Sequence, residues 1–165
     1  MLPVRFGPRR LALLAFLLIL FSPPLSAAAR ADAVALTVVN GSDEVAFKLD
    51  HLAGMPQATV VTDTEFTDGL VEYRGPLVRD FLESLGMGDA ETVRFTAAND
   101  YFVDIPTSDF REYDVILAME ADGVALSRRT KGPLWLMYPI ADFPELRDRI
   151  YNNRLIWQVI KIERL

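Results

Sequence analysis

The sequence predicts an α+β fold with a mixed or mainly antiparallel sheet. Short runs rich in β-branched and aromatic residues recur along the chain, whereas only two segments space their apolar residues as a helix does. The strand and helix patterns do not alternate regularly, as they would in a parallel βαβ fold. We therefore expect one compact, mainly β domain with two main helices.

The expected strands lie on both sides of the clearer helix. Residues 35–49 predict a hairpin around Asn40-Gly41, a pair typical of tight turns. A second turn is expected at Asp122-Gly123. In the stretch TKGPLWLMYP, residues 130–139, a short apolar run between two prolines predicts a buried strand over 135–138. Further strands are expected over residues 58–64, 92–97, 101–105, 114–119 and 155–162.

Two segments predict helices. The first has Pro76 in its first turn, buries a face that includes Phe81 and Leu82, and ends at Gly86. The second is expected over residues 142–152. Trp135, Tyr138, Phe102 and Trp157 have strand spacing, and we interpret them as core residues.

Residues 1–31 predict a cleaved secretory signal peptide. Arginines precede the apolar stretch of residues 11–21, and small residues surround Ala29, where a signal peptidase would cut. The apolar stretch is shorter than the roughly 20 residues that a spanning helix needs, so we expect no membrane insertion after cleavage. Arg9-Arg10 leaves the twin-arginine route as an alternative means of export. Residues 32–165 then form a single domain that is periplasmic or secreted.

The composition excludes several classes of function. Cleavage after Ala31 removes four arginines and no acid, leaving 13 basic residues against 23 acidic ones, a net charge of −10. Such a surface repels nucleic acid and anionic lipid headgroups. The chain has no cysteine, which excludes disulfides, thiol catalysis and thiolate ligation of metals. The single histidine, His51, and serines outside any Gly-x-Ser-x-Gly motif give no support for a zinc enzyme or a serine hydrolase.

Three groups of residues are candidates for ligand binding. Arg128, Arg129 and Lys131 form the strongest basic cluster of the mature chain and suit a small anion, or alternatively a solvated turn. Asn99 precedes Tyr101 in a segment that suits a turn stabilised by a side chain, with Tyr101 at the start of a strand or in a pocket wall.

The third group lies in the loop that precedes the first helix. It contains Asp63, Arg74 and several acids. Asp63 and Glu65 carry the oxygen ligands that calcium and magnesium prefer, but their spacing matches no metal-binding loop, and we favour ordinary surface acids. We predict no catalytic residue and no metal site.

Four segments together resemble the molybdopterin-binding domain of the sulfite oxidase family, and in particular its small, exported, stand-alone members. They are TDTEFTDGLVEYRGPLVRDFLESLGM (62–87), VRFTAANDYFVDIP (93–106), DVILAMEADGVALSRRTKGPLWLMYP (114–139) and IWQVIKIERL (156–165). The resemblance implies a mixed α+β domain around a molybdenum–pterin cofactor. It also implies a cysteine thiolate on the metal and oxygen-atom transfer to sulfite or from a sulfoxide.

The position that the resemblance implies for this cysteine falls near Thr62, Asp63 and Thr64, none of which supplies a thiolate. A carboxylate or alkoxide is a harder ligand with different electronics. We therefore expect no bound molybdopterin, which is implied by the family resemblance only. The leading hypothesis is a periplasmic binding or sensory module that recognises a small anionic ligand or a partner protein. Two alternatives remain: a molybdopterin-dependent oxidoreductase that uses Asp63, a threonine or solvent as the metal ligand, and a structural protein without a pocket.

Overall fold

The structure, a computed structural model, describes residues 33–165, and the signal peptide expected over residues 1–31 lies outside them. The largest sheet has the strand order β2-β1-β11-β5-β6. Only the β1–β11 pair in this sheet is parallel, so the sheet is mixed, as predicted. Its strands are β1 (Val34–Asn40), β2 (Asp43–Lys48), β5 (Thr92–Ala97), β6 (Phe102–Pro106) and β11 (Val159–Arg164).

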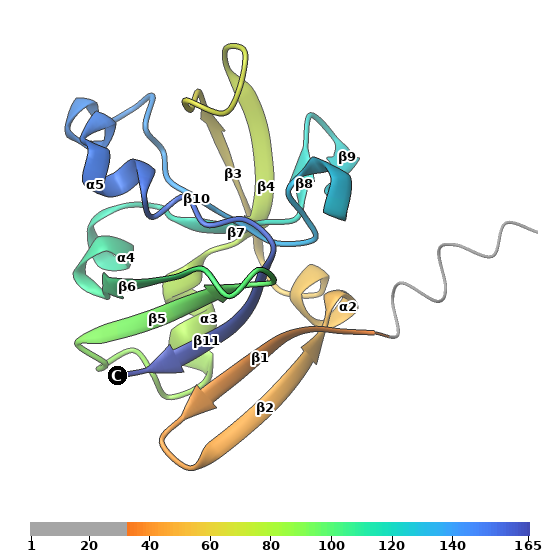
Figure 1. Ribbon diagram of the computed structural model, residues 1–165, viewed down its shortest axis with the longest axis vertical. Coiled ribbons are helices and arrows are strands. Elements are labelled where there is room, and N and C mark those ends of the chain that lie inside the picture. The colour runs from red at the N-terminus through yellow and green to blue at the C-terminus, as the bar shows by residue number, and fades with distance from the viewer. Residues whose placement is uncertain (1–32) are drawn as a thin grey trace, which may run out of the picture.

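Two smaller antiparallel sheets complete the β structure. Figure 1 shows the five-stranded sheet in the lower half of the molecule, the β3–β4 hairpin rising above it, and β7 and β10 crossing between them. The four-stranded sheet, in the order β3-β4-β8-β9, contains β3 (Gln57–Thr62), β4 (Val71–Pro76), β8 (Glu120–Ala121) and β9 (Val124–Ala125). The remaining pair is β7 (Ile116–Ala118) with β10 (Trp135–Met137).

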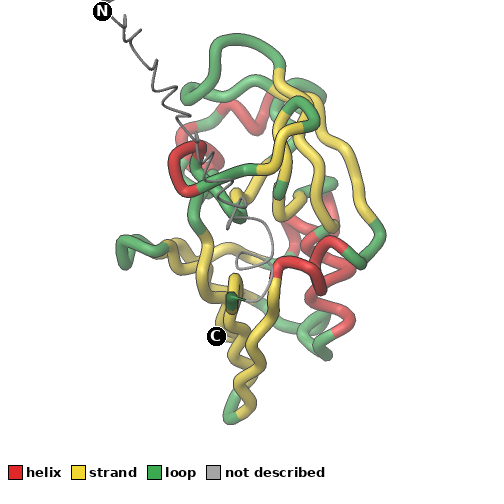
Figure 2. Tube along the Cα trace, turned by 90° about the vertical axis from the view of Figure 1, so that its right-hand side faces the viewer, coloured by secondary structure: helices red, strands yellow, loops and turns green. Residues whose placement is uncertain are grey.

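The helices are short. Helix α3 lies behind the five-stranded sheet in Figure 1 and to its right in Figure 2. Its Phe81 packs edge-on against Phe47 of β2, with ring centroids 5.3 Å apart. None of the helices within residues 33–165 is long and apolar enough to cross a membrane. The helices are α2 (Leu49–Ala53), α3 (Val78–Ser84), α4 (Ser108–Glu112) and α5 (Arg149–Asn152), and two 3₁₀ turns are η1 (Arg128–Thr130) and η2 (Pro144–Arg147).

The core lies between the inner face of the large sheet and the helices. In β5 the side chains of Val93, Phe95 and Ala97 are buried, and the residues between them are partly exposed. This alternation is the period of two that places successive side chains on opposite faces of a strand. Phe95 meets Phe110 of α4 with ring centroids 5.8 Å apart. The alternation of apolar residues in the sequence of β5 therefore corresponds to the side chains that are buried in the core.

Several predicted elements are confirmed. The predicted hairpin forms, but its two turn residues are Gly41, with a φ of +65°, and Ser42, because Asn40 still pairs with Asp43. A second turn at Asp122-Gly123 joins β8 to β9. All three residues of β10 are buried, as expected for the apolar run over 135–138. The fold is therefore α+β and mainly β, as the sequence predicts.

Both helix predictions need correction. The first helix begins at Val78, because Pro76 is the last residue of β4, a strand that the sequence analysis missed. The segment expected as a second helix divides into η2 and α5. Between them Asp148 has extended backbone angles, and its Oδ1 accepts a hydrogen bond from the backbone N–H of Ile150 at 2.9 Å. This cap starts a new helix and so prevents one continuous helix over 142–152. Helices α2 and α4 were not predicted.

Two further details differ from the prediction. Phe102 is 52% exposed, so it is not a core residue. It lies on the outer face of the sheet, with the guanidinium of Arg94 4.3 Å from its ring centre. The last strand begins at Val159 rather than at residue 155, because Gln158 has a φ of +53° and interrupts the extended chain. Before that break, Trp157 makes only an isolated bridge to Trp135.

Candidate functional site

Three hollows adjoin where the loops after β3, β5 and β10 meet the chain before β11. The aspartate pocket, about 260 Å³, is lined by Asp63, Thr64, Glu65, Ile140, Arg147 and Asn152. The tyrosine pocket, about 250 Å³, is lined by Glu65, Phe66, Ala97, Asn99, Tyr101, Asn152, Asn153, Leu155, Ile156 and Trp157. The arginine groove, about 920 Å³, is lined by residues 33–35, Leu49, Ala98, residues 127–129, Gly132, Pro133, Gln158 and Ile160.

The aspartate pocket and the tyrosine pocket are joined through shared residues, and the arginine groove, which shares no lining residue with them, is lined by residues that follow those of the tyrosine pocket in the chain. Glu65 and Asn152 line both the aspartate pocket and the tyrosine pocket. Residues 97 and 157 line the tyrosine pocket, and the residues that follow them, 98 and 158, line the arginine groove. A ligand larger than one pocket can therefore contact more than one of these hollows.

Asp63 is held by an arginine at the mouth of the aspartate pocket. Its two carboxylate oxygens accept hydrogen bonds from Arg147 at 2.9 Å and 3.0 Å. The hydrogen bond from Arg147 lowers the pKa of Asp63 below its usual value. A carboxylate in a two-point contact with a guanidinium is held in a fixed geometry. Both carboxylate oxygens of Asp63 are therefore engaged by Arg147. Within residues 33–165, no group of three or more His, Cys, Asp or Glu residues is placed to hold a metal ion.

Asn99 and Tyr101 form one wall of the tyrosine pocket. The side-chain oxygen of Asn99 accepts a hydrogen bond from the backbone N–H of Tyr101 at 3.2 Å, as the turn prediction expects. The Tyr101 hydroxyl donates to the backbone carbonyl of Asn153 at 3.0 Å. Tyr101 is 47% exposed, so part of its ring is open to a ligand. Asn99 and Tyr101 therefore form the predicted turn and also line the tyrosine pocket.

Lys131 lies among aromatic rings beside the tyrosine pocket. Its Nζ donates to the backbone carbonyl of Phe66 at 3.1 Å. The same nitrogen lies 4.7 Å from the ring centre of Trp135, 5.2 Å from that of Phe66 and 5.7 Å from that of Trp157. Cation–π contacts of this kind attract an ammonium to the faces of the rings. Lys131 therefore ties the loop after β3 to the segment that contains Trp157.

Gly132 of the stretch TKGPLWLMYP lies where its backbone closely approaches the backbone of Leu126. A Cβ atom on Gly132 would lie 2.5 Å from the backbone carbonyl carbon of Leu126 and 2.7 Å from its oxygen. Only glycine fits at this distance without a shift of the backbone. The contact fixes the position of the loop that carries Arg128 and Arg129, both of which line the arginine groove.

Arg74 lies apart from the other predicted residues. It is an exposed residue of β4, and its guanidinium is 3.5 Å from the carboxylate of Glu120 on the neighbouring strand β8. It lines none of the three hollows. The structure thus brings Asp63, Asn99, Tyr101, Arg128 and Arg129 to the hollows, and it places Lys131 beside the tyrosine pocket without lining it. Arg74 lies elsewhere.

A buried ionic group supports the wall of the tyrosine pocket. Arg154 forms an ion pair with Asp109 of α4, and the two side chains are only 11% and 8% exposed. The hydroxyl of Tyr138 donates to the same carboxylate at 2.8 Å. Burial, reinforced by the nearby Asp109 carboxylate, raises the pKa of Tyr138 well above its usual value. These contacts fix the position of Arg154. The residues on either side of it, 152–153 and 155–156, line the tyrosine pocket.

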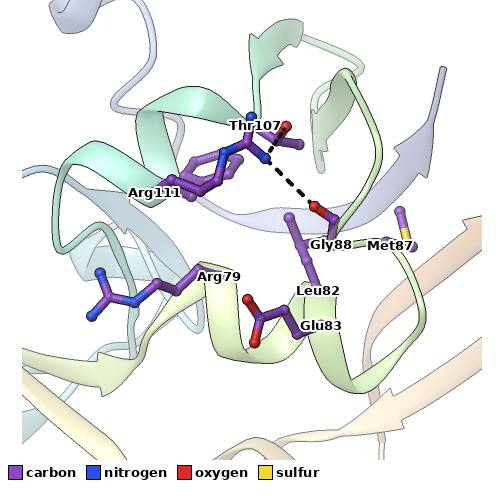
Figure 3. Close-up of a pocket in the computed structure, with 8 residues that line it drawn as sticks. Arg79, Leu82, Glu83, Met87, Gly88, Thr107 and Arg111 are labelled. Carbon is purple, nitrogen blue, oxygen red and sulfur yellow. Dashed lines mark hydrogen bonds between the residues drawn. The ribbon is translucent and has the colours of Figure 1, made fainter.

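A fourth hollow, drawn in Figure 3, lies between α3 and α4. It holds only about 10 Å³, which leaves room for no more than a single water. The Arg111 guanidinium crosses it and donates to the carbonyl of Gly88 at 3.5 Å and to the Thr107 hydroxyl at 3.1 Å. Because the hollow is so small and Arg111 occupies it, we assign it no role.

Comparisons with known proteins establish the family. Residues 25–141 match the model of the oxidoreductase molybdopterin binding domain, and the chain belongs to this family. Its structure is similar to that of the sulfane dehydrogenase SoxCD from Paracoccus pantotrophus, with a TM-score of 0.59 and 18% sequence identity over 81% of this chain and 38% of that chain. At this identity the likeness shows the fold, and it spans 38% of the length of the SoxCD chain. No curated protein matches by sequence. The predicted resemblance is therefore confirmed.

The residues present do not fit the metal end of the family's cofactor. At the implied cysteine position, the buried Thr62 hydroxyl accepts a hydrogen bond from the backbone N–H of Ala141 at 3.1 Å. The Thr64 hydroxyl accepts one from the N–H of Phe66 at 3.1 Å, and the Asp63 carboxylate is bound by Arg147. These oxygens are hard donors, and all of them are already engaged within the protein. We therefore derive no chemistry through molybdenum.

Sequence reasoning missed several residues of the site. Arg147 was expected within an ordinary helix, yet it binds Asp63. Phe66 and Trp157 surround Lys131, and Asn152 lines two of the pockets. No local motif marks these residues, because each reaches the site through tertiary packing. Phe66 and Trp157 carried a weak signal, as aromatic residues in segments that resemble the family.

Proposed function

We propose that this protein is an exported member of the molybdopterin-binding domain family that lacks the metal thiolate and binds a small anionic ligand at these hollows, with the arginine groove as the anion site. In the periplasm or outside the cell, such binding would serve a sensory or partner-recognition role. One observation carries the proposal. The predicted basic residues of the 128–131 segment and the Asp63 loop, which are distant in sequence, meet at one set of adjoining hollows.

The charges at these hollows favour an anion. Within residues 33–165, no Asp or Glu lines the arginine groove, although the chain as a whole is acidic. Arg128 and Arg129 lie on that groove, and Arg147 lies on the aspartate pocket. Guanidinium groups bind carboxylate and phosphate oxygens in pairs of charge-assisted hydrogen bonds. Arg147 is paired with Asp63, and Glu65 lines both pockets, so it is the arginine groove that concentrates positive charge in this acidic protein.

The test is ligand-induced stabilisation. The protein is purified from an exporting host, its N-terminus is read by mass spectrometry, and its thermal unfolding is followed with sulfate, phosphate and small carboxylates at constant ionic strength. A ligand at 100 times its Kd stabilises the folded state by about 2.7 kcal/mol, which raises the Tm by several degrees. We expect at least one anion to do so.

Variants assign the effect to the site. The double variant Arg128→Gln/Arg129→Gln should lose the stabilisation. Arg149→Gln is the matched control, because Arg149 is an exposed arginine of α5 that lines none of the hollows. If no anion raises the Tm, or if both variants lose the effect equally, the proposed function is wrong. Fractionation of the host tests export separately, since a protein retained in the cytoplasm with residues 1–31 intact would contradict it.

No observation favours the oxidoreductase alternative. Its ligand would be Asp63, a threonine hydroxyl or solvent, and the structure commits Asp63 to Arg147 in a two-point contact. Removal of Asp63 from that contact would leave the guanidinium without its carboxylate. We therefore do not propose a molybdenum-dependent reaction for this chain.

A further inference from the structure

Arg128 and Arg129 differ from most of the ten arginines that the structure describes. Within residues 33–165, neither guanidinium has an ion-pair or hydrogen-bond partner, although acids outnumber bases in the chain. Six other arginines lie within ion-pair distance of a carboxylate: Arg74, Arg79, Arg94, Arg147, Arg154 and Arg164. Two adjacent charges without partners therefore stand at the edge of the largest of the hollows described here.

The wall beside these arginines is apolar and open. Val34 is 60% exposed and Ile160 is 42% exposed, and both line the arginine groove. Leu49 and Pro133 line it as well. Exposed apolar side chains gain free energy when a ligand removes them from water. The groove thus offers an apolar surface next to a positively charged end.

The backbone that carries the two arginines is held in place. The side-chain amide of Gln158 donates to the carbonyl of Arg128 at 2.7 Å, and its backbone N–H donates to the carbonyl of Lys131 at 3.1 Å. The Thr130 hydroxyl accepts from the N–H of Ser127 at 2.8 Å, which closes the turn. A ligand therefore meets a preformed loop and has only the side chains to order, which lowers the entropic cost of binding.

We propose that the arginine groove binds a small amphiphilic carboxylate, a molecule with an aliphatic body and one anionic head. The head accepts hydrogen bonds from Arg128 and Arg129, and the body covers Val34 and Ile160. This inference rests on the proposed function and specifies its ligand class. The groove, at about 920 Å³, lies within the size range of small-molecule sites. A free small molecule is favoured over an anionic membrane, because the net charge of −10 that remains after cleavage repels a charged surface.

The experiment measures binding of straight-chain carboxylates to the purified, exported protein by calorimetry below their micelle concentrations. Hexanoate, octanoate and decanoate are compared with acetate, with decanol and with decyltrimethylammonium. A fully buried methylene contributes up to about fourfold in affinity, so decanoate should bind much more tightly than hexanoate. Arg128→Gln/Arg129→Gln should weaken decanoate about tenfold or more, and Arg149→Gln should leave it unchanged.

The apolar wall is tested separately with Ile160→Thr, a change at a partly exposed position of β11. This variant should reduce the dependence of affinity on chain length while leaving acetate unaffected. Circular dichroism and the Tm of each variant without ligand verify that it folds.

The outcomes separate this inference from the proposed function. If sulfate or acetate binds as well as decanoate in an Arg128-dependent manner, the proposed function stands and the amphiphile inference fails. Equal binding of decanoate and decyltrimethylammonium, or binding to anionic vesicles without binding to free decanoate, also overturns the inference. If no anion of either kind binds, both proposals fail together.

Discussion

The buried ion pair between Asp109 and Arg154 gives the most quantitative prediction. Both side chains are nearly inaccessible, with exposures of 8% and 11%, and Tyr138 donates a hydrogen bond to the same carboxylate. Removal of one member of a buried pair leaves the other charge uncompensated, which typically costs 3–5 kcal/mol. Asp109→Asn keeps the shape and an acceptor for the tyrosine, so we expect a loss of about 3 kcal/mol in the free energy of unfolding. Against a total stability of about 5–15 kcal/mol, this is a large fraction.

The assay is urea denaturation followed by circular dichroism and tryptophan fluorescence. Asp104→Asn is the matched control, because Asp104 pairs with Arg94 through two hydrogen bonds at 2.7 Å and 2.8 Å but is 39% exposed. An exposed pair contributes at most about 1 kcal/mol. We expect the two Asp→Asn changes to differ by about 2 kcal/mol or more.

A double-mutant cycle isolates the interaction. The cycle compares Asp109→Leu, Arg154→Met and the double variant Asp109→Leu/Arg154→Met, which replaces both charges with apolar groups. Exchange of a buried pair as a unit often restores stability. The double variant should therefore be no less stable than either single variant. If Asp109→Asn costs no more than Asp104→Asn, or if the two single effects simply add, the burial argument for this pair is refuted.

Three further predictions follow from particular contacts. Gly75→Ala should destabilise the fold by several kcal/mol in chemical denaturation, because its Cβ would lie 2.0 Å from a backbone carbonyl oxygen of β7; Gly54→Ala, with contacts of 3.4 Å, should be tolerated. Arg147 lowers the pKa of Asp63, so the stability that this carboxylate contributes is present above about pH 4 and is lost as pH falls through its folded-state pKa; Asp63→Asn should flatten the acid limb of stability measured from pH 2 to pH 6. Lys131→Met should lose about 1 kcal/mol and alter the tryptophan emission spectrum, and an unchanged spectrum would contradict the aromatic contacts assigned to Lys131.

The strands were largely predictable because their information is local. Alternation of Val93, Phe95 and Ala97 predicts β5 directly, and Asn40-Gly41 predicts the first hairpin. Strand β4 was missed because its alternating pattern runs into Gly75-Pro76, which also suits the start of a helix. The segment is a strand in the folded protein because it pairs with β3 and β8, which are contacts that its own residues do not reveal.

The site was predictable only as separate pieces. Asn99 and Tyr101 predict a turn, and the basic run at 128–131 suits a small anion or a solvated turn, because each of these patterns lies within a few residues. The contact between Asp63 and Arg147 joins positions 84 residues apart, so it depends on the whole topology. Arg74 is the opposite case. It is close to Asp63 in sequence, but in the folded protein it lies on β4 beside Glu120 and away from the hollows.

The most direct test of the account is the molybdenum and pterin content of the protein purified from an exporting host that makes the cofactor. Elemental analysis gives molybdenum per chain, and fluorescence after acid release gives pterin. The account predicts only traces of both, because the Thr62 to Thr64 segment offers hard oxygens that are already bonded within the protein. One molybdenum and one pterin per chain would contradict it and would make Asp63 the first ligand to examine.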